Sequence, residues 1–268
     1  MKYAVMSDVH ANPKALETVL ADAKRHGCRK FVLLGDLTGY GYDVRTTIRL
    51  VRDNFDTVLM GNHDSACVGL EPWLDVALNR NYRVDVLQRD ELDEADRMWL
   101  KTRPYDASEG DAFFVHGDST EPQAWKYVME PEMVVINLFT CPKRIMFCGH
   151  THHAAVWELV MGSRGAPAGR GGLKCKCCPR FLRFLAKPAL VRPDSRSFSV
   201  AGPNHFIVNV GSVGYPRNDL CATYAIYDSS AARVTIRRIP VNLRAYAEDL
   251  SRAGVSIPIW LRDALLTA

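Results

Sequence analysis

The chain has 268 residues, of which 47% are hydrophobic and 24% charged, a composition typical of a folded globular protein rather than a disordered one. Its net charge of +4 is unevenly spread, because residues 161–200 alone carry nine Lys or Arg and one Asp. Eight cysteines are too few for a disulfide scaffold, and no run of about 18 apolar residues indicates a membrane span. No secretory leader precedes the first predicted strand, so we expect a cytoplasmic protein that does not associate with membranes.

The N-terminal segment predicts a strand followed by two candidate metal ligands. The apolar run 3–6 indicates a buried strand, and Asp8 and His10 come directly after it. Residues two apart on an extended chain project to the same side, so this carboxylate and imidazole can meet at one metal ion. Asn12 and Pro13 then begin a predicted helix.

Two further units repeat this arrangement. The apolar run 31–34 ends in Gly35-Asp36, and the run 57–60 ends in Gly61-Asn62, with a helix predicted over 43–53 between them. Successive β-α units place the ends of their strands at one edge of a parallel sheet, where ligands bind. We therefore expect Asp36 and Asn62 to lie beside the first pair.

The pattern returns in the second half of the chain. After a stretch that is predicted to be helical from 65 to 103, with Met98 and Trp99 in the core, the apolar runs 112–115 and 144–148 indicate strands. These two runs precede three further imidazoles at strand ends, which belong to His116, His150 and His152. The remaining predicted elements are a helix at 133–139, strands at 155–160, 206–210, 222–227 and 233–239, and helices at 243–253 and 258–266.

Residues 161–200 interrupt the alternation with a basic segment that contains five Gly and four Pro, which predict little regular structure. We interpret it as a solvated insertion in a single domain that spans residues 1–268. Two alternatives stay open. Its Lys and Arg, interleaved with Phe181 and Phe184, are suited to nucleic acid backbone. Its clustered thiols, on Cys175, Cys177 and Cys178, offer a structural metal site without the usual C-x₂-C spacing.

The strand-end residues together match the needs of a two-metal centre. Two divalent ions roughly 3.5–4 Å apart share a bridging carboxylate and take further private ligands each. The seven candidate ligands are Asp8, His10, Asp36, Asn62, His116, His150 and His152. Such nitrogen and oxygen ligands accept Mn, Fe, Zn, Ni or Co, of which we favour Mn. Because four of the seven are imidazoles and one is an amide, the site is not strongly anionic and favours a negatively charged substrate such as a phosphate ester.

The motifs D-x-H, G-D, G-N-H-D, H-G-D and G-H-T-H, in this order, resemble the calcineurin-like metallophosphoesterase superfamily. The resemblance covers almost the whole chain apart from the basic segment. It implies an α/β fold, a four-layer α/β/β/α sandwich with two central mixed β-sheets and metals at the strand ends. By the family's pattern, the first metal is held by Asp8, His10, Asp36 and His152, and the second by Asp36, Asn62, His116 and His150.

The resemblance also implies a catalytic role for His63, which follows a ligand but is not expected to bind metal. Its counterpart in the family protonates the leaving oxygen or steadies transition-state charge, a role that suits an imidazole. The Ser/Thr protein phosphatases of the family carry G-D-x-V-D-R-G at the second motif, whereas Gly39 and Tyr40 stand here in place of its second Asp and its Arg. The carboxylate that would orient the catalytic His and the Arg that would bind phosphate are therefore absent from this motif.

The second motif and residues 211–217 instead resemble a prokaryotic phosphodiesterase-like branch, related to diadenosine tetraphosphatase-like proteins. In that branch the last motif borders the active site, so Arg217 is a candidate phosphate contact, or else a surface arginine in a turn.

We therefore expect a binuclear metal-dependent phosphoesterase that cleaves phosphodiester or phosphomonoester bonds of nucleotides or other small substrates. The expected mechanism is in-line attack by a hydroxide that bridges the metals, without a phospho-enzyme. The alternatives are a nuclease that holds a polymer on the basic segment, a phosphoprotein phosphatase, and a non-catalytic scaffold on the same fold. The sequence makes no prediction about oligomeric state.

Overall fold

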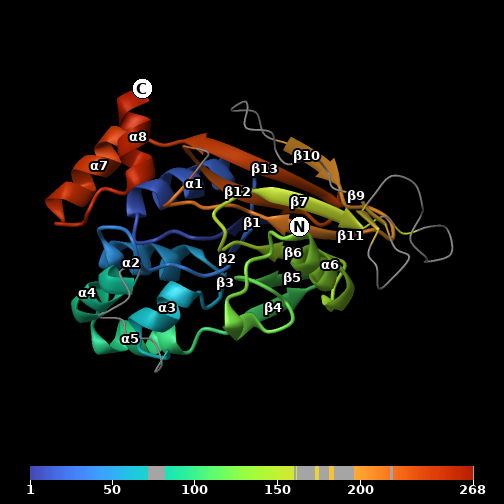
Figure 1. The fold of residues 1–268 in the computed structure, drawn as a ribbon, viewed down its shortest axis with the longest axis horizontal. Helices are drawn as coiled ribbons and strands as arrows, with labels where there is room; N and C mark the ends of the chain where they lie inside the picture. The colour runs from blue at the N-terminus through green and yellow to red at the C-terminus, as the bar shows by residue number, and fades with distance from the viewer. Residues whose placement is uncertain are drawn as a thin grey trace.

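The structure is a computed structural model that describes residues 1–71, 82–159, 161, 173–174, 181–183, 196–217 and 220–267. In this part of the chain, two mixed β-sheets lie face to face with helices on their outer sides (Figure 1). The predicted four-layer α/β/β/α sandwich with two central mixed sheets is therefore confirmed. None of the described helices has the length and apolar character that a membrane crossing requires.

The first sheet carries the three N-terminal strands. Its order is β10 (Arg196–Ser199), β13 (Arg233–Pro240), β12 (Cys221–Asp228), β1 (Lys2–Met6), β2 (Lys30–Leu33) and β3 (Thr57–Val58). β1, β2 and β3 are parallel, and β1 pairs antiparallel with β12 on its other side. The three β-α units thus place their strand ends at one edge, as predicted.

The second sheet has the order β4 (Asp106–Glu109), β5 (Ala112–Val115), β6 (Ile145–Cys148), β11 (His205–Asn209), β7 (Ala155–Leu159), β9 (Phe181–Arg183) and β8 (Leu173–Lys174). β5, β6 and β11 run parallel, which again puts the residues after β5 and β6 at a common edge. The edge strand β4 was not predicted. Its sequence Asp-Ala-Ser-Glu is polar and mostly exposed, so it lacks the apolar pattern of a buried strand.

Alternating side chains of the strands form separate cores on the two faces of each sheet. On β1, Tyr3 and Val5 pack between the sheets, while Ala4 and Met6 pack beneath the helices α1 (Pro13–Arg25) and α2 (Val44–Asn54). The outer face of the second sheet is covered by α6 (Pro131–Thr140). Because both faces are covered, the parallel strands are continuous apolar runs, which explains why the sequence revealed them.

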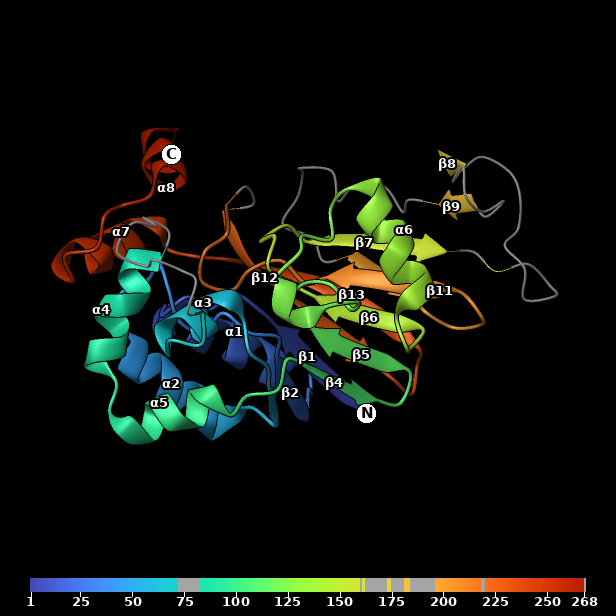
Figure 2. The same cartoon turned by 60° about the horizontal axis from the view of Figure 1, so that its bottom comes forward.

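The stretch that was predicted as helical from 65 to 103 contains the helices α3 (Asn62–Cys67), α4 (Arg83–Glu91) and α5 (Glu94–Lys101), while residues 72–81 lie outside the described part. Figures 1 and 2 both place these three helices at the opposite end of the molecule from α6. The predicted core position of Met98 is wrong, because its side chain is 49% exposed and Leu100 is the buried residue of α5.

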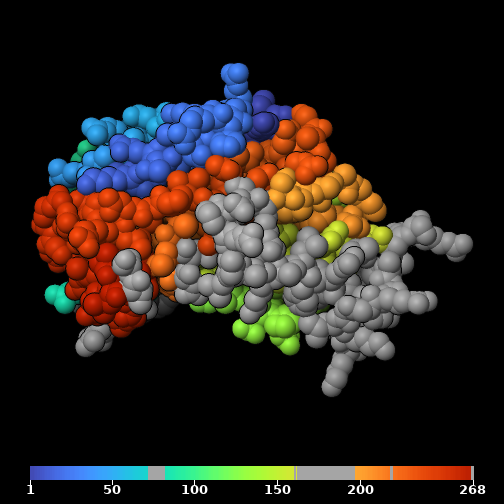
Figure 3. Space-filling model, turned by 90° about the horizontal axis from the view of Figure 1, so that it is seen from above, coloured from blue at the N-terminus to red at the C-terminus, as the bar shows by residue number. Residues whose placement is uncertain are grey.

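The C-terminal helices α7 (Leu243–Arg252) and α8 (Ile259–Thr267) pack on each other beside α1. Figure 3 shows these residues in red next to the blue N-terminal segment. Lys14 of α1 donates to Asp249 of α7 at 2.6 Å, so a salt bridge joins α7 to α1.

Most of the predicted basic insertion at 161–200 lies outside the described residues, including its three cysteines and Phe184. The described pieces include the short strands β8, β9 and β10, and the expectation of little regular structure through most of the segment stays a prediction. The organisation as a single domain with an inserted segment stays a prediction.

Candidate metal centre

All seven predicted ligands lie where the strand ends of the first sheet meet those of the second sheet. Each follows the end of a strand, so the local fold of the apolar runs decides where each ligand emerges. Asp8 and His10 follow β1, Asp36 follows β2, Asn62 follows β3, His116 follows β5, and His150 and His152 follow β6. Three strands of one sheet and two strands of the other thus meet at one site.

The backbone turns sharply at these strand ends. Five of the seven residues have left-handed dihedrals, with φ of 56° at Asp8, 47° at His10, 54° at Asp36, 64° at His150 and 63° at His152. For a residue with a Cβ this conformation costs roughly 1–2 kcal/mol. Such backbone strain concentrates at functional sites, because the surrounding structure must hold it in place.

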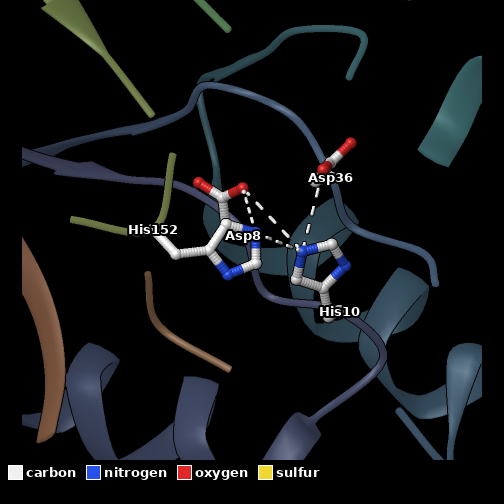
Figure 4. Close-up of side chains that lie close together, drawn as sticks. All are labelled: Asp8, His10, Asp36 and His152. Carbon is white, nitrogen blue, oxygen red and sulfur yellow. Dashed lines mark hydrogen bonds and ion pairs between the residues drawn. The ribbon is translucent and has the colours of Figure 1, made fainter. Parts of the chain in front are cut away.

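Four of the ligands form a first group, which Figure 4 shows: Asp8, His10, Asp36 and His152. One ligand atom from each of the four lies within 4.8 Å of the other three. Nε2 of His10 is 3.2 Å from Nε2 of His152, and Nε2 of His152 is 3.3 Å from Oδ1 of Asp8. This carboxylate oxygen is buried without a hydrogen-bond partner among the described residues, which is costly unless a cation pairs with it.

The second group surrounds one nitrogen of His116. Its Nε2 is 3.1 Å from Nδ1 of His150, 3.2 Å from Oδ1 of Asn62 and 3.3 Å from Oδ2 of Asp36. A single ring nitrogen does not donate to three acceptors, whereas a cation among these atoms would interact with all of them. Asp36 belongs to both groups, which is the position of a bridging carboxylate.

Three of the imidazoles donate their outer N–H to a backbone carbonyl, at 2.8 to 2.9 Å. The donors and acceptors are Nδ1 of His10 with Thr38, Nδ1 of His152 with Tyr215, and Nε2 of His150 with Trp125. This contact settles the tautomer of each ring, because the proton stays on the outer nitrogen and the inner nitrogen keeps its lone pair. Metal-binding histidines in proteins are typically supported in this way.

The ionisation of the site also suits a cation. Burial lowers the pKa values of His10, His150 and His152, in the case of His150 to about 3, so these imidazoles are neutral and can donate a lone pair. Burial alone would raise the pKa of Asp36, but the neighbouring imidazoles, above all His116, outweigh it and hold this pKa well below its usual range. The shared carboxylate is therefore ionised. The donor set and its charge fit a pair of divalent ions.

Four of the seven ligands, Asp36, Asn62, His150 and His152, line a cavity of about 210 Å³. The predicted catalytic His63 and the predicted phosphate contact Arg217 both line it, together with the rings of Tyr40, Tyr82, Trp125 and Tyr127. The Tyr127 ring stacks on His150 with 4.3 Å between the ring centres. The structure thus brings every predicted site residue to one region of the molecule.

His63 has a partner that the sequence analysis missed. Its Nδ1 lies 2.9 Å from Oδ2 of Asp85, a fully buried carboxylate on α4. Burial alone would lower the pKa of His63, but the charges of Asp85 and Asp36 outweigh it and raise the pKa to about 9. The sequence offered one clue, because the polar residues Tyr82, Asp85 and Gln88 recur at a three-residue spacing that places them on one face of a helix.

Comparison with known proteins decides the family. A sequence model of the calcineurin-like phosphoesterase superfamily domain matches residues 1–165. The chain belongs to this superfamily. Membership implies a metal-dependent phosphoester hydrolase, and the motif resemblance found in the sequence is confirmed.

Two solved structures and one further protein sequence are similar to the chain over almost its whole length. A metallophosphoesterase from Sphaerobacter thermophilus is 28% identical and superimposes with a TM-score of 0.74, over 96% of this chain and 95% of that one. A hypothetical protein from Pyrococcus horikoshii, 14% identical, shares the fold with a TM-score of 0.67 over 97% of this chain and 95% of that one. An uncharacterized protein of Methanocaldococcus jannaschii is 26% identical over 98% of this chain and 96% of its own length.

Proposed function

We propose that the protein is a binuclear metal-dependent phosphoesterase that hydrolyses phosphodiester or phosphomonoester bonds of nucleotides or other small substrates. The main support is the position of Asp36, which lines the cavity and belongs to both groups of buried ligands. A single-metal site would not need a carboxylate between two sets of imidazoles.

In this proposal the first ion is held by Asp8, His10, Asp36 and His152, and the second by Asp36, Asn62, His116 and His150. Two divalent transition-metal ions, with Mn favoured, fit these nitrogen and oxygen ligands. When bound, such ions lower the pKa of water towards neutrality and neutralise charge on phosphoryl oxygens.

The chain's own residues would bind the ester and help the alcohol to leave. Arg217 lines the same cavity as four of the ligands, and its guanidinium would supply positive charge for a phosphoryl oxygen. His63 lines the same cavity, and since its Nδ1 is paired with Asp85, its Nε2 is the nitrogen that can protonate a leaving oxygen. The aromatic rings that line the cavity would contact the organic part of the substrate.

The experiment that tests the proposal is hydrolysis of bis-p-nitrophenyl phosphate and p-nitrophenyl phosphate, each with and without Mn²⁺. We expect metal-dependent cleavage by the wild type, with a loss of at least about 10³-fold in Asp36→Asn because the shared ligand loses its charge. His63→Ala should lose about 10²-fold or more. The ratio of the rates on the two esters reports the preference for diesters or monoesters.

Asp53→Asn is the matched control, because Asp53 is an exposed carboxylate on α2 and its change should leave the activity as in the wild type. Metal content is measured on every variant. A wild type that binds two ions per chain and cleaves neither ester would contradict the proposed reaction. A wild type that binds no ion would contradict the centre itself and favour the scaffold alternative.

The nuclease alternative stays a prediction, because most of the basic segment that suggests it lies outside the described residues. Turnover of RNA or DNA that falls steeply with salt, without such dependence on the small diester, would favour it.

A further inference from the structure

Helix α4 buries polar side chains where a purely structural helix would bury apolar ones. Its two buried residues are Asp85 and Gln88, with side chains 0% and 3% exposed. Helices that pack only for stability bury an apolar stripe, and a buried carboxylate or amide is costly unless it is hydrogen-bonded. The inner face of α4 is therefore adapted to specific polar contacts.

The first contact is the pair of Asp85 and His63. Nδ1 of the imidazole lies 2.9 Å from Oδ2 and 3.2 Å from Oδ1 of the carboxylate, and both side chains are buried. A hydrogen bond to Nδ1 keeps the proton on that nitrogen and limits rotation of the ring. Nε2 remains as the nitrogen for the cavity that His63 lines.

The second contact holds the loop that covers this pair. Oε1 of Gln88 accepts from the Gly39 N–H at 2.7 Å, and Nε2 of Gln88 donates to the Gly41 carbonyl at 3.2 Å. Gly39 has a φ of +84°, and a Cβ there would collide with Nδ1 of His63 and lie 3.0 Å from Oδ1 of Asp85. One helix thus fixes both the partner of His63 and the loop packed against it.

We propose that Asp85 is the positioning residue that holds His63 in the orientation for proton transfer to the leaving group. This role rests on the proposed phosphoesterase function. The oxygen of the attacking water forms the new P–O bond while the bond to the leaving oxygen breaks. The proton on Nε2 passes to that oxygen, and the proton lost by the water restores the imidazole. Asp85 accepts the hydrogen bond from Nδ1–H throughout and keeps the ring in place.

In the family motif, the carboxylate that orients the histidine comes from the position that Gly39 occupies in this chain. Asp85 would take over the role of that carboxylate. A side chain at position 39 would displace the imidazole or Asp85, because these two groups already fill that space. The carboxylate comes instead from a helix that is distant in the sequence. A protein of this family can thus keep an oriented histidine without the D-R-G sequence.

The test compares two diesters that differ in the leaving phenol alone, methyl p-nitrophenyl phosphate and methyl phenyl phosphate. The p-nitrophenolate ion leaves readily without a proton, whereas phenol needs one. In Asp85→Asn we expect kcat to fall about 10²-fold on the phenyl ester and less than about fivefold on the p-nitrophenyl ester. His63→Ala should show the same pattern, and the double variant should be no slower than His63→Ala alone.

Asp90→Asn serves as the control, because Asp90 is exposed on the same helix and should leave both rates unchanged. Gly39→Ala disturbs the pair without altering either partner, so it should reproduce the leaving-group pattern even if Asp85→Asn fails to fold. Equal losses on both esters in the folded variants, at full metal content, would overturn the proposal by showing that Asp85 acts on the fold alone. A wild type that cleaves neither ester would refute the proposed function instead.

Discussion

At the residue scale, the site depends on side chains that orient other side chains. Asn62 illustrates this, because its Nδ2 donates to the Tyr82 hydroxyl at 3.0 Å while its Oδ1 faces His116. The hydroxyl therefore decides which end of the amide is turned towards the candidate second ion. Residues that support ligands in this way commonly change metal affinity or activity by 10–100-fold, so their effect is measurable separately from that of the ligands.

Tyr82→Phe is expected to weaken binding of the second ion about tenfold, because the amide is then free to turn its NH₂ group inwards. Binding of the first ion should be nearly unchanged, since among the described residues Tyr82 makes no hydrogen bond or ring contact with its four proposed ligands. Competition between the protein and a chromophoric chelator measures both affinities. Tyr3→Phe is the control, as it removes a tyrosine hydroxyl that bonds to Glu109 far from the site. Equal weakening of both ions would contradict this role.

At the scale of elements, the packing of α1 on the first sheet includes a buried ionic contact. Asp22 of α1 accepts from the Tyr224 hydroxyl of β12 at 2.7 Å and from Nε and Nη2 of Arg237 of β13 at 3.0 Å each. Burial alone would raise the pKa of Asp22, but the hydrogen bonds from Arg237 and Tyr224 outweigh it and lower the pKa. Helix α1 begins at Pro13, shortly after the ligand His10, and these contacts hold its C-terminal part on the sheet.

Asp22→Asn is expected to lower the free energy of unfolding by about 2 kcal/mol at pH 7, because a charged hydrogen-bonding partner is lost. The pKa of Asp22 is depressed in the folded state, so its contribution is fully present above the unfolded pKa of about 4 and disappears as the pH falls through the folded value. Urea unfolding of wild type and variant at pH 7 and pH 3 measures the difference between their free energies of unfolding at each pH. A difference of the same size at both pH values would show that the charge is not its source.

The elements also show what the sequence predicts well. Strands buried on both faces, such as β1, β2 and β6, are uninterrupted apolar runs, so the ligands that follow them were found without the structure. Asp85 was not found, because its partner is distant in the sequence and α4 has no apolar stripe to mark its inner face. The edge strand β4 was missed for a related reason, since exposed polar residues carry no strand pattern. Patterns of apolar residues in the sequence predict which strands and helices are buried. Polar contacts between segments that are distant in the sequence can be found only in the three-dimensional structure.

At the scale of the whole molecule, the proposed metals would join the two sheets. Asp8, His10, Asp36 and Asn62 follow strands of the first sheet, and the other three ligands follow strands of the second. Ions bound between them would hold together two layers that otherwise meet through the apolar core between the sheets. Stability and metal binding should therefore be linked in this protein.

Removal of the metals by a chelator is expected to lower the midpoint of thermal unfolding, and Mn²⁺ should restore it. At a free concentration of about 100 times Kd, each ion adds about 2.7 kcal/mol to the free energy of unfolding. Differential scanning calorimetry with and without Mn²⁺ measures the increase in the unfolding midpoint. This increase should be largely lost in Asp36→Asn, because both ions share that carboxylate. An equal increment in the variant would mean that the ions bind elsewhere.

The left-handed backbone at five of the seven ligands bears on how such a protein evolves. Glycine adopts this conformation without steric cost, so replacing any of the five by glycine removes both a ligand and a source of strain. Most substitutions in a folded protein destabilise it, but in a chain that no longer binds the ions these would relieve backbone strain while they destroy the site. A lineage that no longer needed the chemistry would therefore lose these residues first and keep the sandwich. Inactive descendants of such an enzyme should be recognisable by glycines at the ends of otherwise intact strands.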